Sequence, residues 1–122
     1  MTFTPIHTNR NVFDLEKSVT FYQQALGFAE VRRHNAGGGS FTLVFMKAPG
    51  SAFLLELTWL RDMDCAYNLG DNEIHLAMET DDYAGALAKH REMGCVCQDS
   101  NGRFYFIADP DGYWIEIIKA GD

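Results

Sequence analysis

The two halves of the chain repeat one order of features, and this internal repeat constrains the fold more than any other property of the sequence. In each half a histidine in a short apolar segment is followed seven residues later by an aspartate, as His7 is by Asp14 and His75 by Asp82. Each aspartate opens a stretch of helical periodicity that ends at a glycine, and strand-like segments then lead to one glutamate. Such a repeat indicates a duplicated supersecondary unit.

The first repeat predicts a strand, a helix and three further strands. Asp14 is suited to cap a helix, apolar residues recur at helical spacing up to Leu26, and Gly27 is suited to end it. Turns that contain glycine or proline divide the remainder into three extended segments, Phe28–Asn35, Phe41–Lys47 and Ala52–Trp59.

The second repeat predicts the same order of elements. A strand at Glu73–Glu79 precedes a helix that Asp82 caps and that runs to Met93, with Tyr83, Ala86 and Leu87 facing inward. Strands follow at Val96, Phe104–Ala108 and Tyr113–Ile118, the last two joined by a tight turn over residues 109–112. We therefore expect an α+β fold of two βαβββ modules, about 1–68 and 69–122, that form one domain with curved mixed sheets around a cavity.

Composition excludes several classes of partner. The chain has 122 residues, 47% of them hydrophobic, which suffices for a core without disulfides. Its net charge of −7 and the absence of a basic run argue against nucleic acid and anionic membranes as partners. No leader segment or long apolar run is present, so we expect a cytoplasmic protein whose three cysteines are reduced.

Two carboxylates interrupt apolar strands. Glu56 follows Leu54-Leu55, and Glu116 is flanked by Ile115 and Ile117. An ionised carboxylate in an apolar interior costs about 5 kcal/mol unless a cation, a metal or dense hydrogen bonding compensates it. Each glutamate therefore needs a partner.

His7 and His75 lie in short strands at the same stage of their modules. Either one alone is more typical of an ordinary core or surface histidine. Together with Glu56 and Glu116, they would supply two imidazole nitrogens and two carboxylates, a donor set suited to a borderline divalent metal such as nickel, cobalt, zinc or manganese. Such a site can keep open positions for a substrate.

These residues occur in motifs that resemble glyoxalase I of the vicinal oxygen chelate superfamily, and the resemblance spans nearly the whole chain. The matching segments are Ile6-His7-Thr8, residues 14–22 with their Ser-x-x-Phe-Tyr pattern, Leu55-Glu56-Leu57-Thr58, Ile74-His75-Leu76-Ala77 and the run from Asp109 to Glu116. The helix and turn motifs are typical of the superfamily, whereas the His, Glu, His, Glu ligand order resembles bacterial glyoxalase I.

The resemblance implies that His7, Glu56, His75 and Glu116 hold one divalent metal, nickel with cobalt or zinc as alternatives. It implies a lyase that isomerises the hemithioacetal of methylglyoxal and glutathione, or a related thiol, to S-lactoylglutathione through an ene-diolate. By resemblance Glu116 is the base, and Glu56 can serve the opposite face of the substrate. A homodimer with metal sites at its interface is implied, although the sequence also allows both modules of one chain to close on each other.

The glutathione-binding pattern of the family is only partly present. Where relatives carry an Arg and an Asn that hold the glutamyl end of glutathione, this chain has Asn11 and Leu60. Arg10 and Arg103 are the alternative cations for substrate binding, but Arg10 is shifted by one residue, which reverses the strand face.

Two further functions fit the same sequence. One is another metal-dependent enzyme of the superfamily, an epimerase, a thiol transferase or a dioxygenase. The other is a metal-free binding or resistance protein on the same scaffold. Outside the ligand set, His34 and His90 each neighbour an arginine and are expected to be solvated surface residues.

Overall fold

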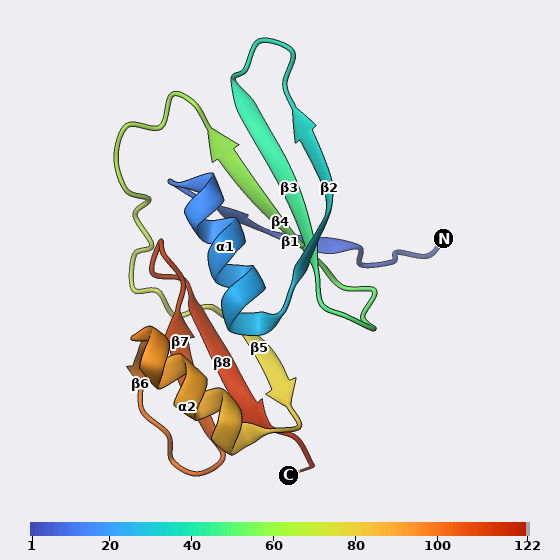
Figure 1. Cartoon of the computed structure of the whole chain (residues 1–122). Coiled ribbons are helices and arrows are strands. Elements are labelled where there is room, and N and C mark those ends of the chain that lie inside the picture. Colours follow the sequence, from blue (N-terminus) through green and yellow to red (C-terminus); the bar gives the residue numbers. More distant parts are fainter. Residues whose placement is uncertain (122) are drawn as a thin grey trace. The chain divides into compact units, whose positions relative to one another are not determined.

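The computed structural model describes residues 1–121 and divides the chain into two compact units, Met1–Tyr67 and Asn68–Asp122 (Figure 1). Each unit contains one strand, one helix and three further strands in that order, as the repeat predicts. The division falls next to the boundary expected between the two modules. That the two modules form one domain stays a prediction.

Unit 1 contains one helix and a four-stranded mixed sheet. Its elements are β1 (His7–Asn11), α1 (Leu15–Leu26), β2 (Ala29–Asn35), β3 (Phe41–Lys47) and β4 (Leu54–Leu60). The strands lie in the order β1-β4-β3-β2, with β1 parallel to β4 and the other neighbours antiparallel. The first strand of the module therefore pairs with the last one.

Unit 2 repeats this topology. Its elements are β5 (His75–Thr80), α2 (Tyr83–Met93), β6 (Val96–Gln98), β7 (Phe104–Ala108) and β8 (Trp114–Lys119). The order is β5-β8-β7-β6, and β5 is parallel to β8. The expected βαβββ architecture with mixed sheets is confirmed, and neither sheet closes into a barrel.

The predicted helix ends are confirmed by their capping contacts. The Asp14 carboxylate accepts a hydrogen bond from the Lys17 amide, and Gly27 ends α1 in the left-handed conformation with φ 69°. Asp82 and Gly94 act in the same way on α2, where Gly94 has φ 71°. No described helix combines the length and the apolar character needed to cross a membrane.

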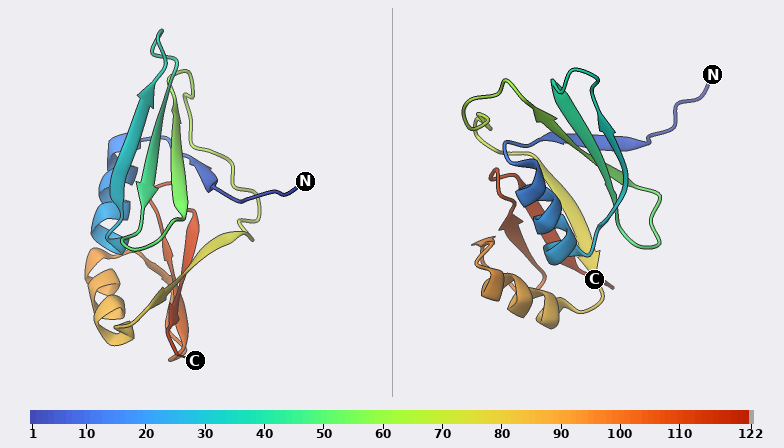
Figure 2. Two further views of the ribbon diagram at one scale, coloured as in Figure 1. Left: turned by 90° about the vertical axis from the view of Figure 1, so that its right-hand side faces the viewer. Right: turned by 45° about the horizontal axis from the view of Figure 1, so that its top comes forward.

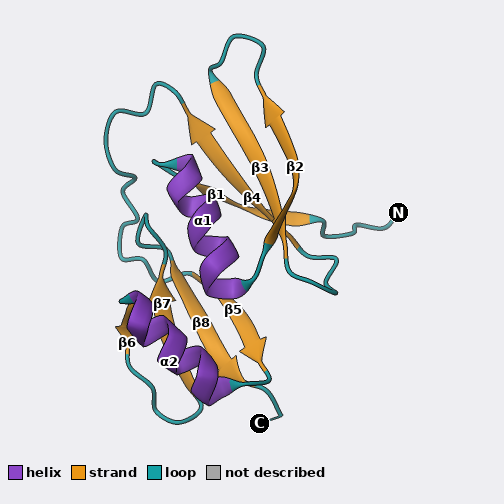
Figure 3. Ribbon diagram, in the orientation of Figure 1, coloured by secondary structure: helices purple, strands orange, loops and turns teal. Residues whose placement is uncertain are grey.

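Each sheet presents one face to its core and the other away from it. Each unit has one helix lying along its sheet (Figures 2 and 3). In unit 1, alternate residues of β3 and β4 are fully buried, namely Val44, Met46, Leu55 and Leu57. In unit 2 the corresponding residues are Tyr105, Ile107, Ile115 and Ile117. Since side chains alternate along a strand, the residues between them lie on the other face.

The surface assignment of His90 was wrong. Its side chain is buried, and its Nδ1 lies 2.7 Å from the Tyr105 hydroxyl. Ala86 and Leu87 are only partly buried, so His90 is the residue of α2 that is most enclosed. His34, by contrast, is exposed as expected.

Candidate metal centre

His7 and Glu56 are brought together by the parallel pairing of β1 with β4. Asn9 is opposite Glu56 in the register, and His7 lies two residues before Asn9, on the same face. The His7 Nε2 is 3.8 Å from the Glu56 Oε2. The imidazole and the carboxylate therefore face each other on the side of the sheet away from the core.

His75 and Glu116 form the equivalent pair in unit 2. Ala77 is opposite Glu116 in the pairing of β5 with β8, and His75 lies two residues before it. The His75 Nε2 is 3.3 Å from the Glu116 Oε1. The two modules thus repeat one structural arrangement down to the facing of the side chains.

Neither carboxylate is enclosed in the apolar core, contrary to what their neighbours in the sequence led us to expect. The Glu56 and Glu116 side chains keep 15% and 18% of their surface exposed, while the adjacent Leu55 and Leu57 are fully buried. Strand alternation explains the difference, because the leucines face the core and the glutamate between them faces away. Both carboxylates are therefore shielded but accessible to a small ligand.

The surroundings of the two carboxylates differ. The Asn9 amide donates to the Glu56 Oε1 at 3.0 Å, and the Thr58 hydroxyl donates to the same oxygen at 3.2 Å. Within residues 1–121, His75 is the polar side chain that contacts the Glu116 carboxylate.

Aromatic rings support both histidines. The His7 ring packs edge-on against Phe45, with centroids 5.5 Å apart, and His75 packs in the same way on Phe106 at 5.1 Å. Trp114 adds a second ring beside Phe106. These contacts restrict the rotation of the imidazoles and favour the orientation in which Nε2 points toward the carboxylate.

The donor types fit a borderline divalent metal, with each unit supplying one imidazole nitrogen and one carboxylate. Within residues 1–121, however, no group of three or more His, Cys, Asp or Glu side chains lies close enough to hold an ion. Each unit therefore carries half of the predicted four-ligand set.

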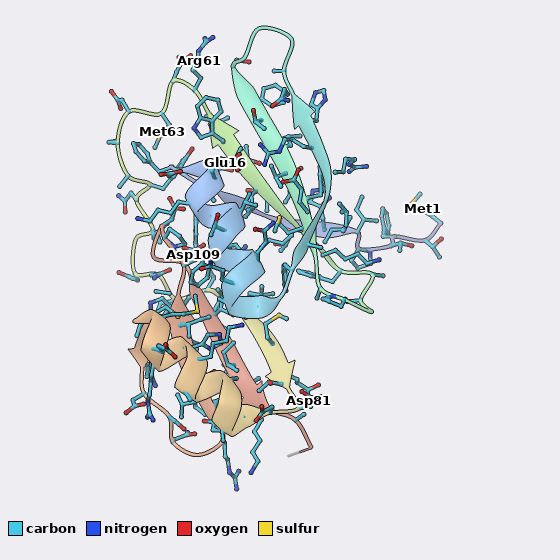
Figure 4. The ribbon with its side chains drawn as sticks, in the orientation of Figure 1. Met1, Glu16, Arg61, Met63, Asp81 and Asp109 are labelled. Carbon is cyan, nitrogen blue, oxygen red and sulfur yellow. The ribbon has the colours of Figure 1, made fainter. Side chains whose placement is uncertain are left out.

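The structure also places the other residues considered for substrate binding. Arg10 lies on the strand face opposite His7, and its Nη1 donates to the Asn9 carbonyl at 2.8 Å. Arg103 is exposed just before β7. A further arginine, Arg61, lies beyond the end of β4 (Figure 4), and its guanidinium is paired with the Asp62 carboxylate.

Sequence reasoning missed Arg32. This residue is opposite Phe45 in the pairing of β2 with β3, and Phe45 is opposite Glu56 in the pairing of β3 with β4. Its guanidinium lies 4.1 Å from the centroid of the Phe45 ring. Arg32 thus places a positive charge on the same sheet face as His7 and Glu56, and a β-bulge after Glu30 sets this register.

Known proteins that are similar to this chain point to one superfamily. Residues 4–117 match the model of the Glyoxalase/Bleomycin resistance protein/Dioxygenase superfamily. The lactoylglutathione lyase of Neisseria meningitidis is 38% identical over 96% of this chain and 92% of its own length. A probable lactoylglutathione lyase of Synechocystis is 34% identical over 93% of both chains.

A solved structure is also similar to this chain over nearly its whole length. The trypanothione-dependent glyoxalase I of Leishmania major superposes with a TM-score of 0.84 at 29% identity, over 97% of this chain and 87% of that one. Both modules of the present chain therefore fall within a single region of similarity. The chain belongs to the glyoxalase/bleomycin resistance protein/dioxygenase superfamily.

Proposed function

We propose that this chain is a metal-dependent lactoylglutathione lyase that isomerises the hemithioacetal of methylglyoxal and glutathione, or a related thiol, to S-lactoylglutathione. The observation that carries the proposal is the repeated pairing of an imidazole with a carboxylate, His7 with Glu56 and His75 with Glu116, on equivalent faces of two equivalent sheets. The names of the similar proteins support the same activity.

His7, Glu56, His75 and Glu116 are the residues that would hold one divalent metal. Nickel is the ion we propose, with cobalt and zinc as alternatives suited to the same donors. When bound, the ion would supply positive charge beside the two adjacent oxygens of the substrate, where negative charge develops as a proton leaves carbon.

The reaction moves protons and leaves the composition of the substrate unchanged. Glu116 accepts the proton from the carbon that carries the hydroxyl and the sulfur, and returns it to the neighbouring carbonyl carbon. The hydroxyl proton passes to the former carbonyl oxygen, so that a thioester and a secondary alcohol result. Glu56 stands in the equivalent position of the other module and is the candidate base for the opposite face of the substrate.

Hydrophobic walls support this role for Glu116. Phe106 lies opposite it on β7 and packs against both His75 and Trp114. These rings limit the approach of bulk water to the carboxylate, which keeps 18% of its surface exposed.

Three arginines are candidates for the carboxylates of the thiol. Arg32 is favoured because it shares the sheet face of Glu56. Arg10 lies on the opposite strand face and Arg103 lies before β7, so both are weaker candidates. Because Asn11 and Leu60 stand where relatives carry the residues that contact glutathione, the proposed substrate includes thiols related to glutathione.

The proposed metal site requires both pairs of ligands. We call these pairs the half-sites: His7 with Glu56 in unit 1, and His75 with Glu116 in unit 2. In a homodimer one protomer would contribute His7 and Glu56, and its partner would contribute His75 and Glu116. This arrangement is the one we propose, and closure of two modules within one chain is its alternative.

The experiment is a turnover assay on protein of known metal content. Purified protein is stripped, loaded with nickel and given methylglyoxal with glutathione, and S-lactoylglutathione is followed by its absorbance. We expect turnover that depends on the metal. Turnover with trypanothione but not glutathione would change the thiol, and no isomerisation with either thiol would refute the proposal.

A further inference from the structure

The two carboxylates of the candidate metal centre differ in how they are held, although the modules that carry them are repeats. Glu56 is contacted on its Oε1 by the Asn9 amide at 3.0 Å and by the Thr58 hydroxyl at 3.2 Å. The second hydrogen of the Asn9 amide is directed to the Thr58 Oγ1 at 2.6 Å. The three side chains thus form a closed hydrogen-bonded triangle.

This triangle uses one oxygen of the Glu56 carboxylate and leaves the other oxygen available to a ligand. Oε1 accepts both hydrogen bonds, whereas Oε2 is the oxygen that faces the Nε2 of His7. Rotation of the Glu56 carboxylate would break two hydrogen bonds, each stronger than a neutral one because the acceptor is charged.

The equivalent positions of unit 2 cannot form such a triangle. The residue two positions after His75 is Ala77, and the residue two positions after Glu116 is Ile118. Both occupy the same register positions as Asn9 and Thr58, but neither side chain carries a hydrogen-bond donor. Glu116 is therefore free of the constraint that fixes Glu56.

We infer that Asn9 and Thr58 are positioning residues that fix Glu56 as a stationary metal ligand through Oε2, and that their absence around Glu116 leaves that carboxylate able to move as the base. The inference rests on the proposed function and narrows it, because a fixed Glu56 serves as a ligand and leaves Glu116 as the base. Ligand-orienting contacts of this kind are worth about 10- to 100-fold in metal affinity. The repeated modules have thus diverged into a fixed half-site and a movable one.

The test compares nickel binding by wild-type protein with that of Asn9→Ala and Thr58→Val. Each variant should raise the Kd for nickel about tenfold in a chelator competition titration. Cobalt-loaded protein should show a changed visible absorption spectrum, because freeing Glu56 alters the ligand field. At saturating nickel, turnover should largely return, since Glu116 is untouched.

Asn35→Ala is the matched control. Asn35 accepts a hydrogen bond from Thr42 at 2.9 Å between neighbouring strands of the same sheet, on the face opposite Glu56. This variant removes an amide-to-hydroxyl contact and should leave the nickel Kd and the cobalt spectrum unchanged. Thr58→Val keeps the β-branched shape of the side chain, so it tests the hydroxyl alone if Asn9→Ala perturbs β1.

The outcomes separate the two proposals. Wild-type nickel affinity and an unchanged cobalt spectrum in both variants would overturn the positioning role, even if the wild type turns over. Weaker nickel binding in both variants, with no isomerisation by the wild type, would support the positioning role and overturn the proposed reaction. A wild-type protein that binds no nickel would overturn both.

Discussion

His75 and Glu116 lie on adjacent parallel strands, with the imidazole Nε2 3.3 Å from the carboxylate Oε1. Phe106 packs against the imidazole, while the side chain next to Glu116 in the register, Ala77, offers it no hydrogen bond. The imidazole is thus supported by an aromatic ring, whereas within residues 1–121 no hydrogen bond from a neighbouring strand fixes the carboxylate. This combination suits a base that must approach substrate and withdraw again.

Glu116→Gln should lower kcat at least about 100-fold, because the amide keeps the shape of the side chain but cannot accept a proton from carbon. Formation of S-lactoylglutathione measures the loss, and circular dichroism checks that the fold persists. Glu92→Gln, which neutralises an exposed carboxylate on α2 of the same unit, should retain full activity. Retained activity in Glu116→Gln would show that another group is the base.

Removal of metal should abolish turnover and lower thermal stability. A cation that binds the folded state raises the free energy of unfolding in proportion to the logarithm of its concentration over Kd. Dialysis against a chelator should therefore lower Tm, and added nickel should restore both Tm and activity. Full turnover by protein shown by elemental analysis to hold no metal would contradict the metal requirement.

The secondary structure was largely predictable because its signals are local. The N-cap contact of Asp14 and the left-handed Gly27 depend on a few neighbouring residues, and both are found as expected. Strand β3 has the predicted bounds, Phe41–Lys47, whereas β4 begins at Leu54 instead of Ala52. Strand ends depend on pairing partners that are remote in the sequence, so their prediction was less accurate.

The residues that surround the candidate ligands on the same face of the sheet were harder to predict than the ligands themselves. Asn9 contacts Glu56 because of the register of β1 with β4, and Arg32 lies over Phe45 because of the register of β2 with β3. A single sequence shows neither register. His90 was misassigned for a related reason. Successive residues of an α-helix point in different directions. Arg91 is therefore exposed, while the ring of the preceding His90 points toward Tyr105 in the core.

Arg32→Ala should raise KM for the hemithioacetal and leave kcat nearly unchanged. A guanidinium that binds a substrate carboxylate contributes equally before and during the reaction, so its loss weakens binding without slowing chemistry. Steady-state kinetics at saturating nickel measure the effect, and Arg91→Ala, which removes an exposed arginine from α2, is the control. An unchanged KM would exclude Arg32 from the substrate site.

Tyr105→Phe should lower the free energy of unfolding by about 1 kcal/mol, because it removes the hydroxyl that bonds the buried His90 ring. Burial also raises the pKa of Tyr105 above its usual range. Above about pH 10 the residue therefore ionises in the unfolded chain but stays protonated in the folded one, and wild-type stability should fall as pH rises. Urea unfolding between neutral and strongly alkaline pH should show a smaller alkaline decline for Tyr105→Phe than for the wild type.

Mixing two inactive variants should distinguish a site made by two chains from a site made by one. His7→Ala damages the half-site of unit 1, and His75→Ala damages that of unit 2, so each homodimer should be inactive. In a mixed dimer with shared sites, both lesions fall in one site and the other site is whole. Random mixing should then recover about a quarter of wild-type activity after the subunits are exchanged, because half of the dimers are mixed and each holds one whole site. If both half-sites came from the same chain, every site in the mixture would lack one histidine, and activity would not return at any mixing ratio.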